Sequence, residues 1–249
     1  MARYFIYLSY NGKAYSGWQV QPNASTVQQT IEEALFTLFR QKVPIVGAGR
    51  TDAGVHARCM VAHFDSKSPI DDLSFLAEKL NRILPRDIAI QRIVPVVAKA
   101  HARFDACSRT YKYYIVDHKD VFQTDFMYRM RGILDFAVMN QACQILLDTI
   151  DFTSFSKLHT DVKTNNCHIS HAEWEKEGSA WVFTIKADRF LRNMVRAVVG
   201  TLIEVGQGKK DLADFHQIIA SKDRCKAGMS VPGHALYLVA IDYPNHLFL

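Results

Sequence analysis

The residues best suited to chemistry lie in a short glycine-bounded loop. Arg50 and Asp52 stand two positions apart in a stretch that has glycines at 47, 49 and 54. Glycine allows tight turns and lets the backbone approach a ligand closely. Loops between buried segments often carry catalytic groups, and Arg50 would favour the charged form of Asp52. The loop is therefore a candidate for presenting an ionised carboxylate that acts as a nucleophile or a base.

Two other interpretations of this loop compete with the catalytic one. It could be a surface turn with an incidental ion pair, since glycine turns are common. It could also be a dinucleotide-binding turn, which requires G-x-G-x-x-G at the start of a helix. Here the third glycine is displaced, and Asp52 would repel the pyrophosphate. The sequence also lacks G-K-[ST], so both kinds of phosphate-binding loop are excluded.

The loop resembles a known catalytic motif. Residues 49–57, Gly-Arg-Thr-Asp-Ala-Gly-Val-His-Ala, look like the motif of the TruA family of tRNA pseudouridine synthases. Residues 10–28 are similar to the amino-terminal pattern of that family, although Trp18 alone could equally pack in a core or contact RNA. The resemblance continues in matching order along nearly the entire chain. It implies an α+β fold of two similar lobes with a central RNA-binding cleft.

Tyr111 is the second candidate residue. It shares a strand face with Tyr113 and Ile115, where the usual fate of a tyrosine is cross-strand packing. The alternative is a ring that stacks on a base, with its hydroxyl near the chemistry. Arg109-x-Tyr111-x-Tyr113, with residues 102–104, looks like the second motif of the family, which implies that Tyr111 is the active-site tyrosine.

A basic stripe is expected on a helix over residues 190–205. At 100° per residue, Arg189, Arg192 and Arg196 fall together, with Gly200 beside them. The stripe fits an ordinary solvated face, and it also fits a phosphate-binding or carboxylate-pairing face onto which Gly200 admits another segment. Residues 190–200 resemble the third family motif, which implies that Arg196 pairs with Asp52 and that Arg192 contacts substrate.

The resemblance also implies a reaction. It would be isomerisation of uridine to pseudouridine in the tRNA anticodon stem-loop, at nucleotides 38, 39 and 40, by a homodimer that needs no cofactor and no metal. Asp52 would either attack C1′ or act as a base at the ribose, and the sequence does not choose between them. Arg50 would help the base leave its stack, and Leu236 would line the base pocket. Binding of tRNA without catalysis, action at other RNA positions, and a nucleotide-dependent oxidoreductase are the rival functions.

Three departures from the family pattern concern the choice of tRNA rather than the chemistry. Cys59-Met60 replace the usual Gly-Gln, and Arg189 replaces a small residue. The loop at residues 156–166 is only loosely similar to its counterpart.

Composition is consistent with this interpretation. The 249 residues are 49% hydrophobic and carry a formal net charge of +5, which permits a polyanionic partner without requiring one. Five scattered cysteines without a C-x-x-C pair favour reduced thiols in a cytoplasmic protein. Cys167, His168 and His171 could suggest a metal site, but a strand would point positions three apart to opposite faces. No membrane span or signal peptide is expected.

The elements predict two lobes, 1–104 and 105–249, each opening on an aromatic strand. We expect strands at residues 4–10, 55–64, 88–97, 109–116, 167–177, 180–187 and 235–243, and helices beginning near residues 26, 72, 136, 190 and 211. The shared order of elements indicates a weak internal duplication.

Overall fold

The structure is a computed structural model that describes residues 1–157 and 163–249, in two compact units. Unit 1 comprises Met1–Cys107 and Tyr237–Leu249, and unit 2 comprises Ser108–Leu236. The division expected from the sequence, at residue 104, assigned the carboxyl-terminal segment to the second lobe, whereas Tyr237–Leu249 belongs to unit 1. Part of the loosely similar loop at 156–166 lies outside the described residues. No described helix is long and apolar enough to cross a membrane.

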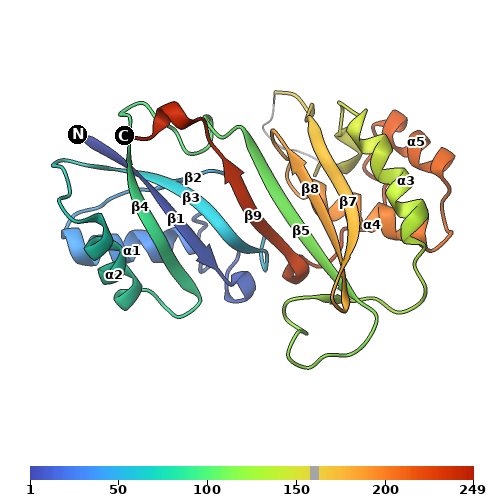
Figure 1. Cartoon of the computed structure of the whole chain (residues 1–249), viewed down its shortest axis with the longest axis horizontal. Coiled ribbons are helices and arrows are strands. Elements are labelled where there is room, and N and C mark those ends of the chain that lie inside the picture. Colours follow the sequence, from blue (N-terminus) through green and yellow to red (C-terminus); the bar gives the residue numbers. More distant parts are fainter. Residues whose placement is uncertain (158–162) are drawn as a thin grey trace. The chain divides into compact units, whose positions relative to one another are not determined.

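The sheet of unit 1 is mostly antiparallel. Its strands are β1 (Ala2–Tyr10), β2 (Val46–Gly47), β3 (His56–Ser66), β4 (Ile88–Val96) and β9 (Leu236–Asp242). β1 pairs with β3 on one side and β4 on the other, β2 pairs with β3, and β9 runs parallel to β3 (Figure 1). Aromatic and β-branched residues suit such strands because their side chains pack well on a pleated surface. β1 is buried on both faces, and the ring of Tyr243 packs 5.0 Å from that of Phe5.

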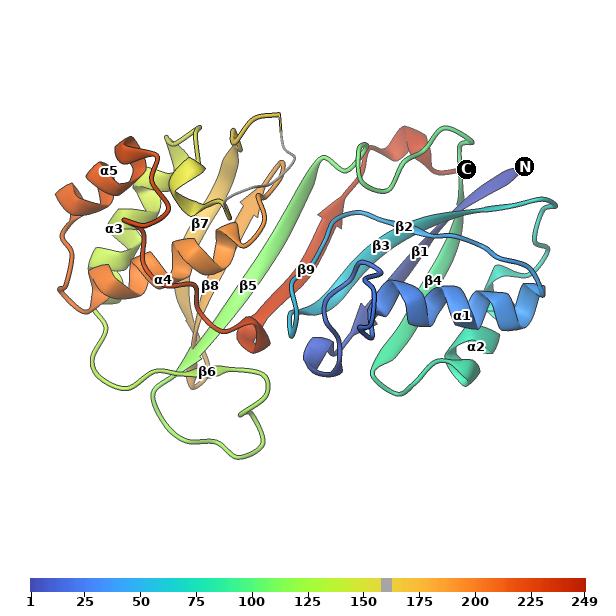
Figure 2. The same cartoon turned by 180° about the vertical axis from the view of Figure 1, so that it is seen from behind.

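Two helices cover one face of this sheet (Figure 2). Helix α1 (Val27–Phe39) begins after Thr26, whose hydroxyl accepts the N–H of Gln29, and α2 (Leu73–Ile83) begins after Asp72, whose carboxylate accepts the N–H of Phe75. These side chains satisfy backbone donors that a helix start leaves unpaired. The expected helix starts near residues 26 and 72 are confirmed. The short 3₁₀ turns of unit 1 are η1 (Gly12–Ala14) and η4 (Asn245–Leu247).

Unit 2 repeats this plan with other residues. Its strands are β5 (Ser108–Val116), β6 (Tyr128–Arg129), β7 (Ile169–Glu177) and β8 (Ala180–Ala187), and its helices are α3 (Phe136–Leu147), α4 (Met194–Gly206) and α5 (Leu212–Ser221), with 3₁₀ turns η2 (Thr153–Phe155) and η3 (Gly233–Ala235). β8 pairs antiparallel with β5 and β7, while β6 is parallel to β5. Figure 2 shows α4 in front of β7 and β8, with α3 and α5 beside it.

Both units are therefore helix-flanked, mostly antiparallel sheets, which confirms the expected fold class. In unit 2, Phe183 and Trp174 from adjacent strands lie buried, with ring centroids 5.2 Å apart. β7 and β8 form a hairpin through Gly178, which adopts a φ of +61° that a side chain would disfavour.

His63 on β3 makes the stability of unit 1 depend on pH. Burial, with the nearby charges of Arg3 and His101, lowers the pKa of His63 from 6.5 to about 4. Its Nδ1 accepts the N–H of Ala102 at 3.1 Å, which requires the unprotonated nitrogen. Between pH 6.5 and 4 the unfolded chain takes up a proton that the folded chain does not, so this stabilisation is present above pH 6.5 and is lost as pH falls.

We expect His63→Asn to flatten this dependence, because the amide oxygen can accept the same N–H without titrating. From pH 7 to 4, the free energy of unfolding should fall by roughly 2 kcal/mol more in the wild type than in the variant. Urea denaturation across that pH range measures the difference. Parallel curves for the two proteins would contradict the assignment to His63.

Candidate active site

The Asp52 loop is a tight turn in which Asp52 is partly exposed. The carbonyl of Asp52 accepts the N–H of Val55 at 3.2 Å, and Gly54 adopts a φ of +75°. A left-handed residue at the third position is the pattern of a type II turn, which explains the glycine there. Asp52 is half-buried and Arg50 is exposed. The turn therefore gives the backbone at Asp52 a defined conformation.

The amino-terminal segment packs directly against this turn. Trp18 donates its backbone N–H to the carbonyl of Thr51 at 3.2 Å, and Gly54 donates its backbone N–H to the carbonyl of Tyr15 at 3.3 Å. The Trp18 side chain is 2% exposed, and a Cβ on Gly47 would meet its ring at 2.5 Å. Trp18 is therefore a core residue that supports the loop, and the alternative of an RNA-contacting surface at Trp18 is wrong.

Tyr111 on β5 lies opposite Ile185 of β8 and remains half-buried. The ring of Phe190 meets its ring edge-on, with centroids 5.2 Å apart. Tyr113, two residues along the same face, is fully buried, and its hydroxyl donates to the carbonyl of Pro232 at 3.1 Å. Burial raises the pKa of Tyr113. Of the two tyrosines, Tyr111 is the more exposed.

The arginine stripe requires a correction. Helix α4 begins at Met194, four residues later than the sequence predicted, so Arg189 and Arg192 precede it and share no helical face with Arg196. The reason is Asn193, which adopts a left-handed φ of +65° and cannot continue a helix. Arg192 is exposed on this bend, where its carbonyl accepts the N–H of Lys157 at 3.1 Å.

Arg196 is held in place by the segment that follows α5. Its Nε donates to the carbonyl of Val231 at 2.7 Å, and the N–H of Val231 donates to the carbonyl of Arg196 at 3.2 Å. The expectation that Gly200 admits another segment is confirmed, since a Cβ there would lie 1.8 Å from the carbonyl oxygen of Met229. Half-buried Arg196 is thus fixed by backbone contacts on its own unit.

The candidate residues are distributed over both units. Arg50 and Asp52 belong to unit 1, whereas Tyr111, Arg192, Arg196 and Leu236 belong to unit 2. Leu236 is 4% exposed at the first position of β9. The pairing of Arg196 with Asp52 and the place of Leu236 in a base pocket stay predictions.

Two side chains that hold the Asp52 loop were not predicted from the sequence. Tyr10 is hydrogen-bonded to the hydroxyl of Thr51 at 2.8 Å, and Nδ1 of His56 accepts the N–H of Gly12 at 3.0 Å. The signal available in the sequence was the pair of glycines, Gly12 and Gly17, in the segment that resembles the family pattern. Glycines there implied a close backbone approach, but nothing in the sequence named the partner.

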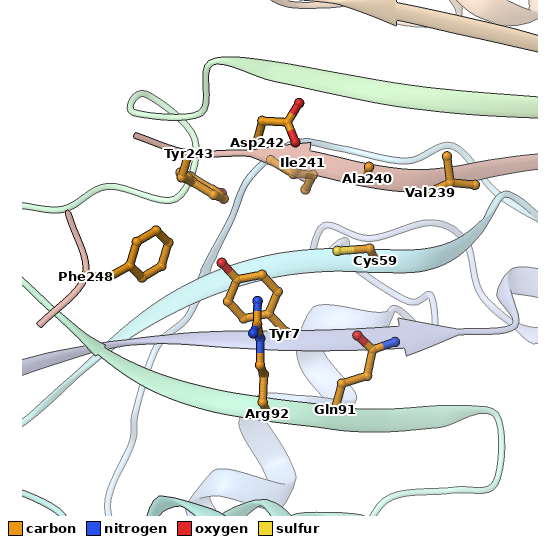
Figure 3. A pocket seen from close by; sticks show the side chains of 10 residues that line it. All are labelled: Tyr7, Cys59, Gln91, Arg92, Val239, Ala240, Ile241, Asp242, Tyr243 and Phe248. Atoms are coloured by element: carbon orange, nitrogen blue, oxygen red, sulfur yellow. The ribbon is translucent and has the colours of Figure 1, made fainter. Parts of the chain in front are cut away.

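Unit 1 also contains a recess of about 390 Å³ that Arg50 and Asp52 do not line. Figure 3 shows the lining side chains, which come from Tyr7, Cys59, Gln91, Arg92, residues 239–243 and Phe248. The guanidinium of Arg92 lies 4.2 Å from the centre of the Tyr7 ring. Burial raises the pKa of the Cys59 thiol, so this cysteine is not an activated nucleophile. The recess is not the predicted site of catalysis.

Comparison with known proteins identifies the family. The model of a family described as tRNA pseudouridine synthase matches residues 6–105 and 142–244. The chain therefore belongs to the tRNA pseudouridine synthase family. It is 68% identical to a protein of Parabacteroides distasonis over all of this chain and 98% of that relative, and 60% identical to one of Porphyromonas gingivalis over the full length of both. A protein of Bacteroides thetaiotaomicron is 58% identical over all of this chain and 93% of its own length. Each of these relatives carries the name tRNA pseudouridine synthase A.

Proposed function

We propose that this chain isomerises uridine to pseudouridine in the anticodon stem-loop of tRNA, at nucleotides 38, 39 and 40. The observation that carries the proposal is the turn that presents half-buried Asp52 within the motif of residues 49–57. Family membership and the full-length similarity to relatives named tRNA pseudouridine synthase A support the same activity.

The reaction needs no redox step and no external group donor. The N1–C1′ bond of the uridine breaks, the base rotates, and C5 bonds to C1′. The proton on C5 is lost and N1 gains one, so the product is an isomer of the substrate. Asp52 acts either by attacking C1′ or as a base at the ribose. A hydrolase would need a second carboxylate to activate water, whereas the proposed partner of Asp52 is Arg196.

The remaining candidate residues bind the RNA. The target base must leave its stack before a side chain can reach it, and exposed Arg50 supports this step by filling the vacated space. Tyr111 stacks on the extruded base and Leu236 contributes to the apolar wall of its pocket. Arg192, exposed on the bend before α4, is suited to a phosphate contact, which positions RNA without reading its sequence.

We further propose that the chain works as a homodimer in the cytoplasm. All five cysteines are free, which suits a reducing compartment. Light scattering of the purified protein tests the dimer, since a mass near that of one chain would contradict it.

Release of tritium from tRNA labelled at uridine C5 tests the proposed activity. We expect one tritium released for each pseudouridine formed, with the modified nucleotides mapping to positions 38–40. Modification at other positions would show a synthase with a different substrate. Binding of tRNA without release, from any tRNA tried, would show an RNA-binding protein on the same scaffold and would overturn the proposal.

A further inference from the structure

The residue before Asp52 is fixed from two directions. Thr51 is 7% exposed, its carbonyl accepts the N–H of Trp18, and its hydroxyl is hydrogen-bonded to the hydroxyl of Tyr10 at 2.8 Å. Thr51 shares a peptide unit with Asp52, so these two contacts fix the plane from which the Asp52 side chain projects.

Close packing leaves this peptide no room to shift toward the amino-terminal segment. A Cβ on Gly17 would lie 2.4 Å from the carbonyl oxygen of Thr51, and one on Gly12 would lie 2.0 Å from that of Val55. Gly17 also adopts a φ of +100°. Backbone therefore packs against backbone on both sides of the Asp52 turn. The side chains that form hydrogen bonds there have little room to move.

The carboxyl-terminal side of the turn has its own anchor. His56 is 2% exposed, its Nδ1 accepts the N–H of Gly12 at 3.0 Å, and its ring stacks on Tyr237 with centroids 4.7 Å apart. The turn is thus secured downstream by His56 and upstream by Thr51. Upstream, the Tyr10 hydroxyl is a side-chain contact that a small substitution can remove without disturbing the backbone.

We propose that Tyr10 is a positioning residue for Asp52 and acts through Thr51. This inference rests on the proposed function, because it assigns Asp52 the central chemistry. Its physical basis is that a reacting group must be held close to its productive geometry, and a small misplacement costs rate rather than binding. The Tyr10 ring also packs on Trp18, with centroids 6.1 Å apart. Tyr10→Phe keeps that packing and removes only the hydroxyl.

The test compares Tyr10→Phe with Tyr4→Phe in the tritium-release assay. Tyr4 is a matched control because it lies on the same strand, is also buried, and its hydroxyl accepts a hydrogen bond from the N–H of Ile70 at 2.9 Å. We expect Tyr10→Phe to lower kcat about ten-fold with KM for tRNA changed less than about two-fold. Tyr4→Phe should leave both constants near wild type, whatever it does to the midpoint of unfolding.

Variants at Thr51 test whether the effect passes through this residue. Thr51→Ser retains the hydroxyl and should keep kcat close to wild type, whereas Thr51→Val should lower kcat about as much as Tyr10→Phe does. The double variant Tyr10→Phe with Thr51→Val should be no slower than either single one, because both remove the same hydrogen bond.

Equal kcat values for Tyr10→Phe and Tyr4→Phe would overturn the inference, as would multiplicative losses in the double variant. Either result, obtained with a wild type whose activity depends on Asp52, leaves the proposed function standing. Wild-type protein that releases no tritium, or whose release survives loss of Asp52, would instead overturn the proposed function and this inference with it.

Discussion

Replacing Asp52 by asparagine is expected to lower tritium release from labelled tRNA by at least about 10³-fold, the scale on which removal of a nucleophile acts. Asparagine has nearly the shape of aspartate but carries no charge, and an amide can neither attack C1′ nor accept a proton at the ribose. The turn is closed by the carbonyl of Asp52 and shaped by Gly54, and asparagine changes neither, so the loop should keep its conformation.

Binding of tRNA should survive this substitution. Affinity for RNA depends largely on contacts between basic side chains and phosphates, and removing a carboxylate takes no such contact away. Filter binding of Asp52→Asn should give a Kd for tRNA within about three-fold of wild type. Asp71→Asn is the control, because Asp71 is an exposed carboxylate of unit 1 that does not cap α2. Residual turnover in Asp52→Asn above about a tenth of wild type, or roughly 1.4 kcal/mol of barrier, would remove Asp52 from the central role.

Local chemistry explains where sequence reasoning succeeded. The starts of α1, α2 and α5 were expected near residues 26, 72 and 211, and in the structure the side chains of Thr26, Asp72 and Asp211 accept nearby backbone N–H groups there. Such a cap involves residues within three positions of each other, so it can be recognised from the sequence alone. The expected strands likewise followed from runs of aromatic and β-branched residues.

The start of α4 shows where a periodic pattern misleads. Residues 190–193 continue the helical spacing, but Asn193 adopts a left-handed conformation and its side chain donates to the hydroxyl of Ser230. Ser230 is 37 residues away from Asn193 in the sequence, so no local pattern predicts this contact. Spacing alone therefore gave a stripe of three arginines, of which only Arg196 lies on the helix.

The contacts around Asp52 were hidden for the same reason. Tyr10 and Thr51 are 41 residues apart, and Gly12 and His56 are 44 apart. The sequence identified the loop because its residue types are unusual together. It did not reveal the supporting side chains, because tyrosine in a strand and histidine beside one are ordinary features of a core.

Gly200 sets the distance between α4 and the segment over residues 228–231. A Cβ at Gly200 would lie 1.8 Å from the carbonyl oxygen of Met229, and Gly228 donates its N–H to the hydroxyl of Thr201 at 2.9 Å. The obstacle is backbone held by several hydrogen bonds, so it cannot move aside cheaply. Alanine would gain about 1 kcal/mol of helix propensity, but the overlap should cost several times that.

We therefore expect Gly200→Ala to lower the free energy of unfolding by about 2 kcal/mol or more. It should also lower tritium release, since the displaced segment contains Val231, whose carbonyl holds Arg196. Gly206→Ala, on the same helix, is the matched control. Its Cβ would meet Sδ and Cγ of buried Met139 at 2.4 and 2.9 Å, and these side-chain atoms can shift at lower cost than hydrogen-bonded backbone. Urea denaturation should give Gly200→Ala a lower free energy of unfolding than Gly206→Ala. A free energy of unfolding for Gly200→Ala equal to that of the wild type would mean that the 228–231 segment moves aside at little cost, and that Arg196 is not fixed by it.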